Sequence, residues 1–464
     1  MLTKFRNPFI TFLEKNDGRL TSQYVVTFCA CICQFSSGLS YSWIIPSLNK
    51  VMSDEYPFKM SPDEASYLAI MNQIGYVVGA VMSAHLMDIL GRKWTLVWTS
   101  LPMVASFLMI SLCDYSNILL YVARVLGGIG EACATGIVGI YIAEIASPAH
   151  RGMLVNSINI AYIISAILIC LYGYYLSLQA AALVSLAFPI LFLLTFTSMP
   201  ESPYYLLMKK DTEGARRSLR LLRRKEDIEL EAISLQADVD RQMSERGGYR
   251  ELFTIPANRR AICLMLCVKF LHLGTGFNAI GAYVQVLLEQ ERISAVWGMF
   301  VIGVLSAVVY ISGNFLLDKL GRKKLAVISS TTTTICLLGI SAFFLLRDSF
   351  RLDLSNLAWL LFVLVVCYYI CFSGMSTVIN VFATELFSNS VKAEGTALNM
   401  VIHGLGTMAT TKYYQFAGDH IALFVPFLTF GLITLFGVFF FIFVMPETKG
   451  KTLEAIQVEL KNKK

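Results

Sequence analysis

The stretch HLMDILGRK, residues 85–93, is a short polar interruption between two long apolar runs, at about residues 66–87 and 95–112. It returns as NFLLDKLGRK at residues 314–323, again between apolar runs. The Asp, Gly, Arg and Lys keep identical spacing, and the second copy follows the first by 230 residues (318 − 88), about half of the chain. One copy would be explained equally well as a basic loop at a membrane edge, but two favour a structural motif with a glycine turn between helices.

Two further segment pairs repeat with nearly the same offset. EIASPAHR at 144–151 and ELFSNSVK at 385–392 each place an acid seven residues before a base, and they lie 241 residues apart. PES at 200–202 returns 246 residues later as PET at 446–448. Together the three pairs indicate that a half-length unit was duplicated, and such repeats constrain the architecture before any local assignment is made.

The composition indicates a membrane protein. Hydrophobic residues make up 56% of the 464 residues and charged residues only 15%, and the mean hydropathy is +0.62. These values are too apolar for a soluble domain of this length. A helix needs roughly 20 apolar residues to cross a bilayer. Twelve such runs are present, at about residues 24–46, 66–87, 95–112, 117–143, 153–175, 178–199, 261–287, 295–317, 326–346, 356–384, 394–417 and 420–445.

We therefore predict an all-α integral membrane fold of 12 transmembrane helices in two pseudo-symmetric six-helix halves. The only sizeable polar piece lies between the halves, where two charge-laced segments are typical of amphipathic helices. Because about sixty residues cannot build much of a core, we expect short helices packed beneath the bundle. The predicted divisions are a tail at 1–23, a first half at 24–199, a linker at 200–260, a second half at 261–445 and a tail at 446–464.

Lysine and arginine orient the spans. With both termini in the cytoplasm, 30 of the 38 basic residues fall on that side, five fall outside and three fall within spans. This is the bias expected of cytoplasmic loops. The net charge of +6 mostly reflects this sorting, and the linker carries nearly as many acids as bases, which argues against a nucleic-acid surface. We expect a multi-pass plasma-membrane protein with both termini cytoplasmic and no cleavable signal peptide.

The sequence offers little for catalysis. The eleven cysteines lie mainly in predicted spans without paired CxxC spacing, so we interpret them as small apolar packing residues rather than zinc or redox groups. We find no metal-binding cluster, nucleophile–base pair or phosphate-binding loop. The chain is therefore predicted not to be an enzyme and to need no cofactor or metal.

Three of the charged side chains inside predicted spans bear on function. Arg124 lies about two turns into span four, Glu131 follows seven residues later on the same face, and Lys269 lies in span seven. A charge near the bilayer centre costs roughly 3 kcal/mol on insertion scales, so such groups are paired or face water. We favour a permanent pair between Glu131 and either Arg124 or Lys269, with a titrating Glu131 as the alternative.

Span seven, KFLHLGTGFNAIGAY at 269–283, is interrupted by glycines. Irregular backbone at membrane depth is tolerated where it lines a cavity or is buried in protein. A lone histidine would more often be structural, but this cluster of polar residues favours a substrate site. Spans ten and eleven also have softened, polar centres. The residues of the three spans that we expect to meet substrate are His272, Thr275, Asn278, Tyr283, Asn380 and His403.

These motifs resemble those of the sugar porter family of the major facilitator superfamily, over essentially the whole chain. Within that family the chain looks most like the insect facilitated trehalose transporters. The matching segments are DILGRK at 88–93 and its repeat, Arg124 with Gly128, YIAEIASPAHRG at 141–152, PESP at 200–203, ELFS at 385–388 and PETKG at 446–450.

The family's sugar-binding residues carry over in part. Asn278 and Tyr283 match its span-seven pattern, with Thr275 and Gly276 at its Ser-Gly, but its Gln-Gln pair is replaced by His272 and Leu273. The resemblance therefore implies a sugar transporter with an altered sugar cage. The family's span-five Gln, span-eight Asn and span-eleven Asn fall on Asn159, Ser306 and His403, and its span-ten Glu, prolines and Trp on Phe372, Thr377, Ile379 and Asn380. We therefore expect Asn159 to bind substrate as well.

The resemblance implies facilitative uniport of a sugar such as trehalose or a hexose, by rocking of the two halves about a central site. The expected partners are this small-molecule substrate and membrane lipid, and a monomer should suffice. The resemblance also implies a cytoplasmic charge cluster that latches the halves in the outward-open state. Its members would be Asp88, Arg92, Glu144, Arg151, Asp318, Arg322 and Glu385.

Three alternatives remain open. Proton-coupled relatives carry an acid in span one, where this chain reads Gln34 to Gly38, so uniport is favoured, but a titrating Glu131 would permit symport. The altered cage leaves a non-sugar polar solute open. A receptor that binds sugar without moving it is the third, and the predicted tails of about 23 and 19 residues argue against it because such receptors usually carry long cytoplasmic tails.

Overall fold

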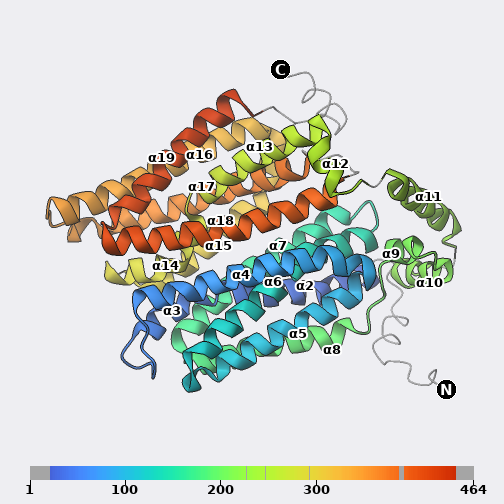
Figure 1. The fold of residues 1–464 in the computed structure, drawn as a ribbon, viewed down its shortest axis with the longest axis horizontal. Coiled ribbons are helices and arrows are strands. Elements are labelled where there is room, and N and C mark those ends of the chain that lie inside the picture. The colour runs from blue at the N-terminus through green and yellow to red at the C-terminus, as the bar shows by residue number, and fades with distance from the viewer. Residues whose placement is uncertain (1–20, 226, 246, 292, 386–390, 446–464) are drawn as a thin grey trace.

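The computed structural model describes residues 21–225, 227–245, 247–291, 293–385 and 391–445, and within these ranges it contains helices and connecting loops but no strand (Figure 1). The first half comprises α2 (Thr21–Ser42), α3 (Ile44–Met52), α4 (Pro62–Ile89), α5 (Arg92–Ser111), α6 (Asn117–Ile145), α7 (Arg151–Tyr175) and α8 (Leu178–Phe196). The second half comprises α13 (Pro256–Leu273), α14 (Phe277–Gln290), α15 (Ala295–Leu320), α16 (Arg322–Phe344), α17 (Ala358–Glu385), α18 (Lys392–His420) and α19 (Phe424–Phe443).

Twelve membrane spans account for the two halves, as predicted, because α2 with α3 and α13 with α14 each form one span. Ten helical stretches of the described residues are long and apolar enough to cross a membrane. The other two positions are taken by α15, whose apolar part spans Ala295–Tyr310, and by α18, which carries many polar residues. A polar membrane helix is stable when its polar side chains face protein rather than lipid, and α18 packs against α4 and α13.

The two halves repeat one packing scheme. In the first half α6 packs against α4 and α5, and α5 packs against α8. In the second half α17 packs against α15 and α16, and α16 packs against α19. Each pair has its counterpart at the same place in the order of helices, so the repeat read from the sequence is also a repeat of structure. Figure 1 shows the blue-to-green half and the yellow-to-red half as separate bodies that meet along one face.

The halves meet through helix pairs that the repeat also relates. α4 packs on α18 and α7 packs on α15, while α3 packs on α14 at the end of the molecule far from the linker helices (Figure 1). Several polar contacts cross the interface at this α3/α14 end. Lys412 contacts Asp63 and lies 3.2 Å from the Ser66 hydroxyl, and Asn49 donates to Glu289. At the opposite end, the ion pairs Arg92–Glu144, Arg216–Glu229, Arg223–Glu231 and Arg241–Asp238 lie within the first half or the linker.

The repeated polar loops have the same backbone geometry. Gly91 precedes α5 with φ +92° and ψ 170°, and Gly321 precedes α16 with φ +86° and ψ 161°. Glycine adopts positive φ without the steric penalty that a side chain brings. The prediction that these glycines turn the chain tightly between helices is therefore confirmed in both copies.

The linker forms four short helices: α9 (Pro203–Met208), α10 (Thr212–Arg223) and α11 (Glu229–Glu245), which pack against one another, and α12 (Tyr249–Thr254), which packs against α13 and α18 of the second half. The Asp211 side chain caps α10 by accepting from the Gly214 N–H at 2.9 Å. Arg223 reaches the end of α6, where it donates to the Ile145 carbonyl at 2.8 Å. The two predicted amphipathic segments are thus helices, and α10 is attached to the membrane bundle.

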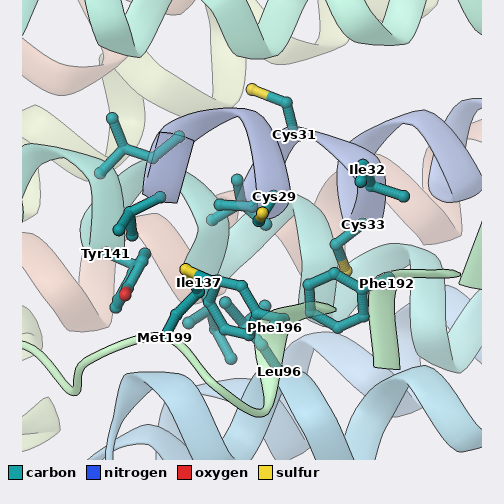
Figure 2. Close-up of a cluster of buried hydrophobic side chains, with 14 of the residues drawn as sticks. Cys29, Cys31, Ile32, Cys33, Leu96, Ile137, Tyr141, Phe192, Phe196 and Met199 are labelled. Carbon is teal, nitrogen blue, oxygen red and sulfur yellow. The ribbon is translucent and has the colours of Figure 1, made fainter. Parts of the chain in front are cut away.

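The cysteines of span one belong to an apolar core. Cys29 and Cys33 point toward Ile137, Phe192 and Phe196, so α2, α6 and α8 contribute to one cluster (Figure 2). Cys31 points away from these rings, and its sulfur lies 3.3 Å from the Ser157 hydroxyl (Figure 2). All three cysteines are buried, which agrees with the packing role that we inferred.

Candidate functional site

The predicted break in span seven is present between α13 and α14. Gly276 adopts φ +72°, and a Cβ at this position would lie 2.2 Å from the Phe430 ring. The Thr275 hydroxyl donates to the His272 carbonyl at 2.7 Å, and the Tyr368 hydroxyl donates to the Thr275 carbonyl at 3.0 Å. These bonds satisfy backbone groups that the helix leaves unpaired at the break. Thr275 therefore shapes the site through the backbone.

Asn278, the second residue of α14, connects three spans. Its side-chain oxygen accepts from the Tyr41 hydroxyl of α2 at 2.7 Å, and its side-chain nitrogen donates to the Thr407 hydroxyl of α18 at 2.8 Å. The first bond crosses between the two halves. Because a neutral amide offers both donors and an acceptor, Asn278 is able to exchange either bond for a hydroxyl of a polar solute.

Buried side-chain oxygens without a hydrogen-bonding partner gather on the helices around Asn278. Tyr369 of α17 packs on Phe277 at 5.3 Å, and its hydroxyl lies 3.6 Å from where a Cβ on Gly281 would be. Buried polar groups are nearly always paired in folded proteins, so unpaired ones mark places where water or a ligand binds. Among the described residues, the unpaired buried oxygens include those of Gln34, Gln73, Tyr283, Ser306, Tyr369 and Asn399.

His272 lies in a stack of aromatic rings. Its ring is 5.2 Å from Phe372 and 6.2 Å from His403, with interplanar angles of 7° and 19°. Phe372 stacks in turn on Phe277 at 3.8 Å, and Tyr76 of the first half meets His403 edge-on at 5.9 Å. Stacking of this kind fixes ring planes. The structure thus brings together the predicted residues His272 and His403 with Phe372.

The buried charges of span four have partners other than those we favoured. The Arg124 guanidinium donates to the carbonyls of Leu68 at 3.2 Å and Ser40 at 2.5 Å, and it lies 5.3 Å from the centre of the Trp43 ring. Glu131 accepts from the Asn72 amide at 2.8 Å. Among the described side chains Glu131 forms no direct ion pair with Arg124 or Lys269. Backbone carbonyls, which are within reach of a long guanidinium, satisfy Arg124 instead.

A second polar cluster forms at the linker end of the first half. The Arg92 guanidinium lies 3.0 Å from the Glu144 carboxylate and 4.0 Å from that of Asp88, and over the Tyr205 ring at 5.4 Å. The Ser202 hydroxyl also donates to Glu144. The structure therefore joins Asp88, Arg92 and Glu144, three members of the predicted charge cluster, within one half.

Glu201 is a member of this cluster that the sequence analysis missed. Its carboxylate accepts from the Lys93 N–H at 3.0 Å and the Ser202 N–H at 2.8 Å, so it caps the start of α5, where a negative charge is favourable. A Cβ on Gly91 would lie 2.5 Å from a Glu201 oxygen. Burial raises the pKa of Glu201, and these hydrogen bonds partly oppose the shift. The available signal was the PES repeat, which we used only as evidence of duplication.

The remaining predicted residues do not join either cluster among the described contacts. Asn159 on α7 is exposed and donates to Asn156 at 3.5 Å. Tyr283 packs on Tyr414 at 5.1 Å. Arg151 is exposed at the start of α7, and Arg322 is partly buried at the start of α16. The side chains of Asp318, Asn380 and Glu385 lie outside the described residues.

Comparison with known proteins identifies the family. The family model described as "Sugar (and other) transporter" matches residues 24–460. The facilitated trehalose transporter Tret1 of Bombyx mori is 27% identical over 451 residues, which cover 95% of this chain and 87% of that protein. The protein of the same name from Drosophila willistoni is 28% identical over 409 residues, 86% of this chain and 46% of that protein. The chain thus spans about half of the length of this Drosophila relative.

Solved structures agree in fold. The inward-open form of the xylose transporter XylE from E. coli matches with a TM-score of 0.78 at 17% identity, over 94% of this chain and 99% of that chain. The proton:xylose symporter XylE bound to 6-bromo-6-deoxy-D-glucose matches with a TM-score of 0.76 at 17% identity, over 96% and 100% of the two chains. The fold is therefore that of these major facilitator superfamily structures. The chain is a multi-pass membrane protein that belongs to the sugar transporter family.

Proposed function

We propose that this protein is a facilitative uniporter of a neutral sugar, trehalose or a hexose, in the plasma membrane. Membership of the sugar transporter family and the likeness to proteins named facilitated trehalose transporters support the substrate class. A monomer would suffice, with membrane lipid around it, because each chain contains both halves. We further propose that residues 1–23, the linker at 200–260 and residues 446–464 lie in the cytoplasm, in accordance with the positive-inside bias.

The observation that carries this proposal is the polar surround of the break in span seven. Asn278 bonds to both halves there, and unpartnered hydroxyl and amide oxygens lie on neighbouring helices. A sugar presents many hydroxyls, and each one left unpaired after dehydration costs roughly 1–3 kcal/mol. Neutral donors and acceptors such as Asn278, Tyr283 and Asn159, with Gln34, Gln73 and Tyr369, suit that requirement.

The contacts between halves support a state that is closed at the α3/α14 end. Polar contacts join the halves there through Lys412, Asn49 and Tyr41. At the linker end Arg92 and Glu144 bond within their own half, and Arg151 is exposed. If the linker end is cytoplasmic, this is an inward-facing arrangement. In the opposite state the remaining cluster members, Arg151, Asp318, Arg322 and Glu385, would join the latch.

Counterflow uptake into proteoliposomes tests the proposal. Labelled trehalose and labelled glucose are offered separately, with unlabelled sugars and polyols as competitors. We expect saturable exchange of at least one sugar, insensitive to an uncoupler. Replacing Asn278 with Ala should lower kcat/KM at least tenfold, equivalent to about 1.4 kcal/mol, because both of its hydrogen bonds and its substrate contact are lost.

A matched control separates a site effect from general damage. Gln179→Ala removes a partly exposed amide that donates to Asp114, and it should leave exchange unchanged. Absence of exchange for every sugar tested in a correctly folded wild-type protein would overturn the proposed substrate class. Exchange of a different polar solute in that case would indicate that the central site binds that solute instead of a sugar.

Proton-coupled symport is the second candidate because Glu131 is buried without a direct ion pair among the described residues. A proton gradient should then drive accumulation of the sugar, and Glu131→Gln should abolish accumulation while sparing exchange. Under the uniport proposal the wild-type protein accumulates nothing above the outside concentration, and Glu131→Gln still exchanges sugar. The two outcomes are mutually exclusive.

A further inference from the structure

The second half contains buried basic groups that recognition of a neutral sugar does not require. Lys269 on α13 is 6% exposed, and among the described residues its ammonium group has no hydrogen-bonding or ion-pair partner. His272 lies three residues later, on the same helical face. Both ring nitrogens of His272 and the Nδ1 of His403 are buried and unpartnered. The His403 ring lies 6.2 Å from the His272 ring, so the three groups form one cluster from α13 and α18.

The aromatic stack fixes the plane in which the His272 nitrogens form hydrogen bonds. The His272 ring lies nearly parallel to the rings of Phe372, at 5.2 Å, and His403, at 6.2 Å. An imidazole forms hydrogen bonds in its own plane, where one nitrogen of the neutral ring donates and the other accepts. The neighbouring Lys269 supplies three further N–H donors on a flexible stem. One N–H from each imidazole and the ammonium group can therefore donate to an acceptor group, while the second nitrogen of His272 can accept from a hydroxyl of the same solute.

The charges of the two halves differ in balance. In the first half the buried Arg124 and Glu131 have opposite signs. In the described part of the second half, Lys269 is not stabilised electrostatically by any acid. Glu394 is buried on α18, but it precedes His403 by nine residues, about 14 Å along a helix axis. An ammonium group buried without a counter-charge is costly, and a bound anion would remove that cost.

We propose that Lys269, His272 and His403 bind the carboxylate of a sugar-sized monoanion, so that the transporter binds a sugar acid in preference to the corresponding neutral sugar. This inference rests on the proposed transport function and extends its substrate class from neutral sugars to sugar acids. A carboxylate has two oxygens and about four acceptor positions, which suits donors from three side chains. The single fixed charge of Lys269 matches one negative charge, which favours a carboxylate over a dianionic phosphate ester.

The test compares D-glucuronate with D-glucose, which differ by a carboxylate at one carbon. Both are used as competitors of sugar counterflow, and the ratio of their inhibition constants is measured because it does not depend on overall activity. We expect glucuronate to inhibit at a concentration at least tenfold lower than glucose, and Lys269→Gln to bring the ratio close to one. Lys59→Gln removes an exposed lysine that pairs with Asp54, and it should leave the ratio unchanged.

A binding measurement keeps this inference separate from the transport proposal. Glucuronate should raise the Tm of the purified full chain in detergent more than glucose does, and Lys269→Gln should remove the difference even if no sugar is exchanged. His272→Phe preserves the ring stack but removes its nitrogens, so it should lower the preference at least threefold and serves if Lys269→Gln folds poorly. Equal affinity for the two sugars, a preference that survives both substitutions, or tighter binding of glucose 6-phosphate would each overturn the proposal.

Discussion

The two halves share one packing scheme but treat their buried basic groups differently. In the first half Arg124 is bonded to two backbone carbonyls and covered by the Trp43 ring. In the second half Lys269 has no partner among the described residues, and the nitrogens of His272 beside it are also unpaired. The Arg124 guanidinium is therefore satisfied by the protein itself, as expected of a structural interaction. The basic groups of the second half are not satisfied by the described residues, which is typical of a binding site.

Substitution of Arg124 should produce the largest loss of stability, because it removes a buried charge whose hydrogen bonds are all made within the protein. Arg124→Leu leaves two buried carbonyls unpaired and Glu131 without a nearby positive charge. We expect a loss on the order of 3–5 kcal/mol, measured as a fall of several degrees in Tm or a failure to accumulate folded protein. Arg241→Leu, which removes only an exposed pair with Asp238, should have no comparable effect. An unchanged Tm for Arg124→Leu would mean that the contacts of Arg124 do not stabilise the fold.

Gly91 tests whether the linker-end cluster of the first half is equally rigid. An alanine there meets a Glu201 oxygen at 2.5 Å and must adopt φ +92°. We expect a loss of about 1–3 kcal/mol for such strain, together with slower exchange, measured by Tm and initial counterflow rates. Gly152→Ala is the matched control because a Cβ there has nothing within 4 Å. Equal behaviour of the two variants would contradict the close packing of Gly91.

Replacing Lys269 should raise the Tm, whereas replacing Arg124 lowers it. Lys269→Met removes a buried unpaired charge while keeping a flexible side chain of similar length. In the absence of any solute we expect the protein to become more stable by on the order of 1 kcal/mol, measured as a rise in Tm. A fall in Tm as large as that of Arg124→Leu would show that contacts within the protein stabilise Lys269.

Glu201 should give the smallest effect, visible only as a dependence on pH. Burial raises its pKa above the ordinary value of 4.5, so the folded protein keeps the proton to higher pH than the unfolded chain does. The stability contributed by this group is therefore fully present below pH 4.5 and is lost as the pH rises through the raised pKa. Glu201→Gln should flatten this part of the curve of Tm against pH. Glu213→Gln, at an exposed position, should leave the curve as it is.

The sequence was sufficient for the elements that depend on repetition and local chemistry. The duplicated motifs predicted equivalent loops, and Gly91 and Gly321 adopt matching positive φ. The glycines of span seven predicted a break, and Gly276 provides it. The sequence was not sufficient for contacts between distant segments. The bond between Tyr41 and Asn278 joins residues 237 positions apart, and no local pattern indicates it.

The partners of buried charges were the main error of the sequence analysis. We favoured an acid as the partner of Arg124 because side chains are what a sequence displays. The carbonyls of Ser40 and Leu68 satisfy it instead, and backbone groups carry no residue-specific signal. The role of Glu201 was missed for a related reason, since its partners are the backbone N–H groups of Lys93 and Ser202.

Trp43 beneath the Arg124 guanidinium gives the protein an optical property. Its ring is fully buried in the turn between α2 and α3, two residues after Tyr41, whose hydroxyl binds Asn278. The other four tryptophans, Trp94, Trp98, Trp297 and Trp359, are exposed on the bundle. Opening of the α3/α14 end would bring water to one indole and leave the surroundings of the other four almost unchanged. The change in intrinsic fluorescence, and its protection from an aqueous quencher, would therefore follow the opening of this end without an added label.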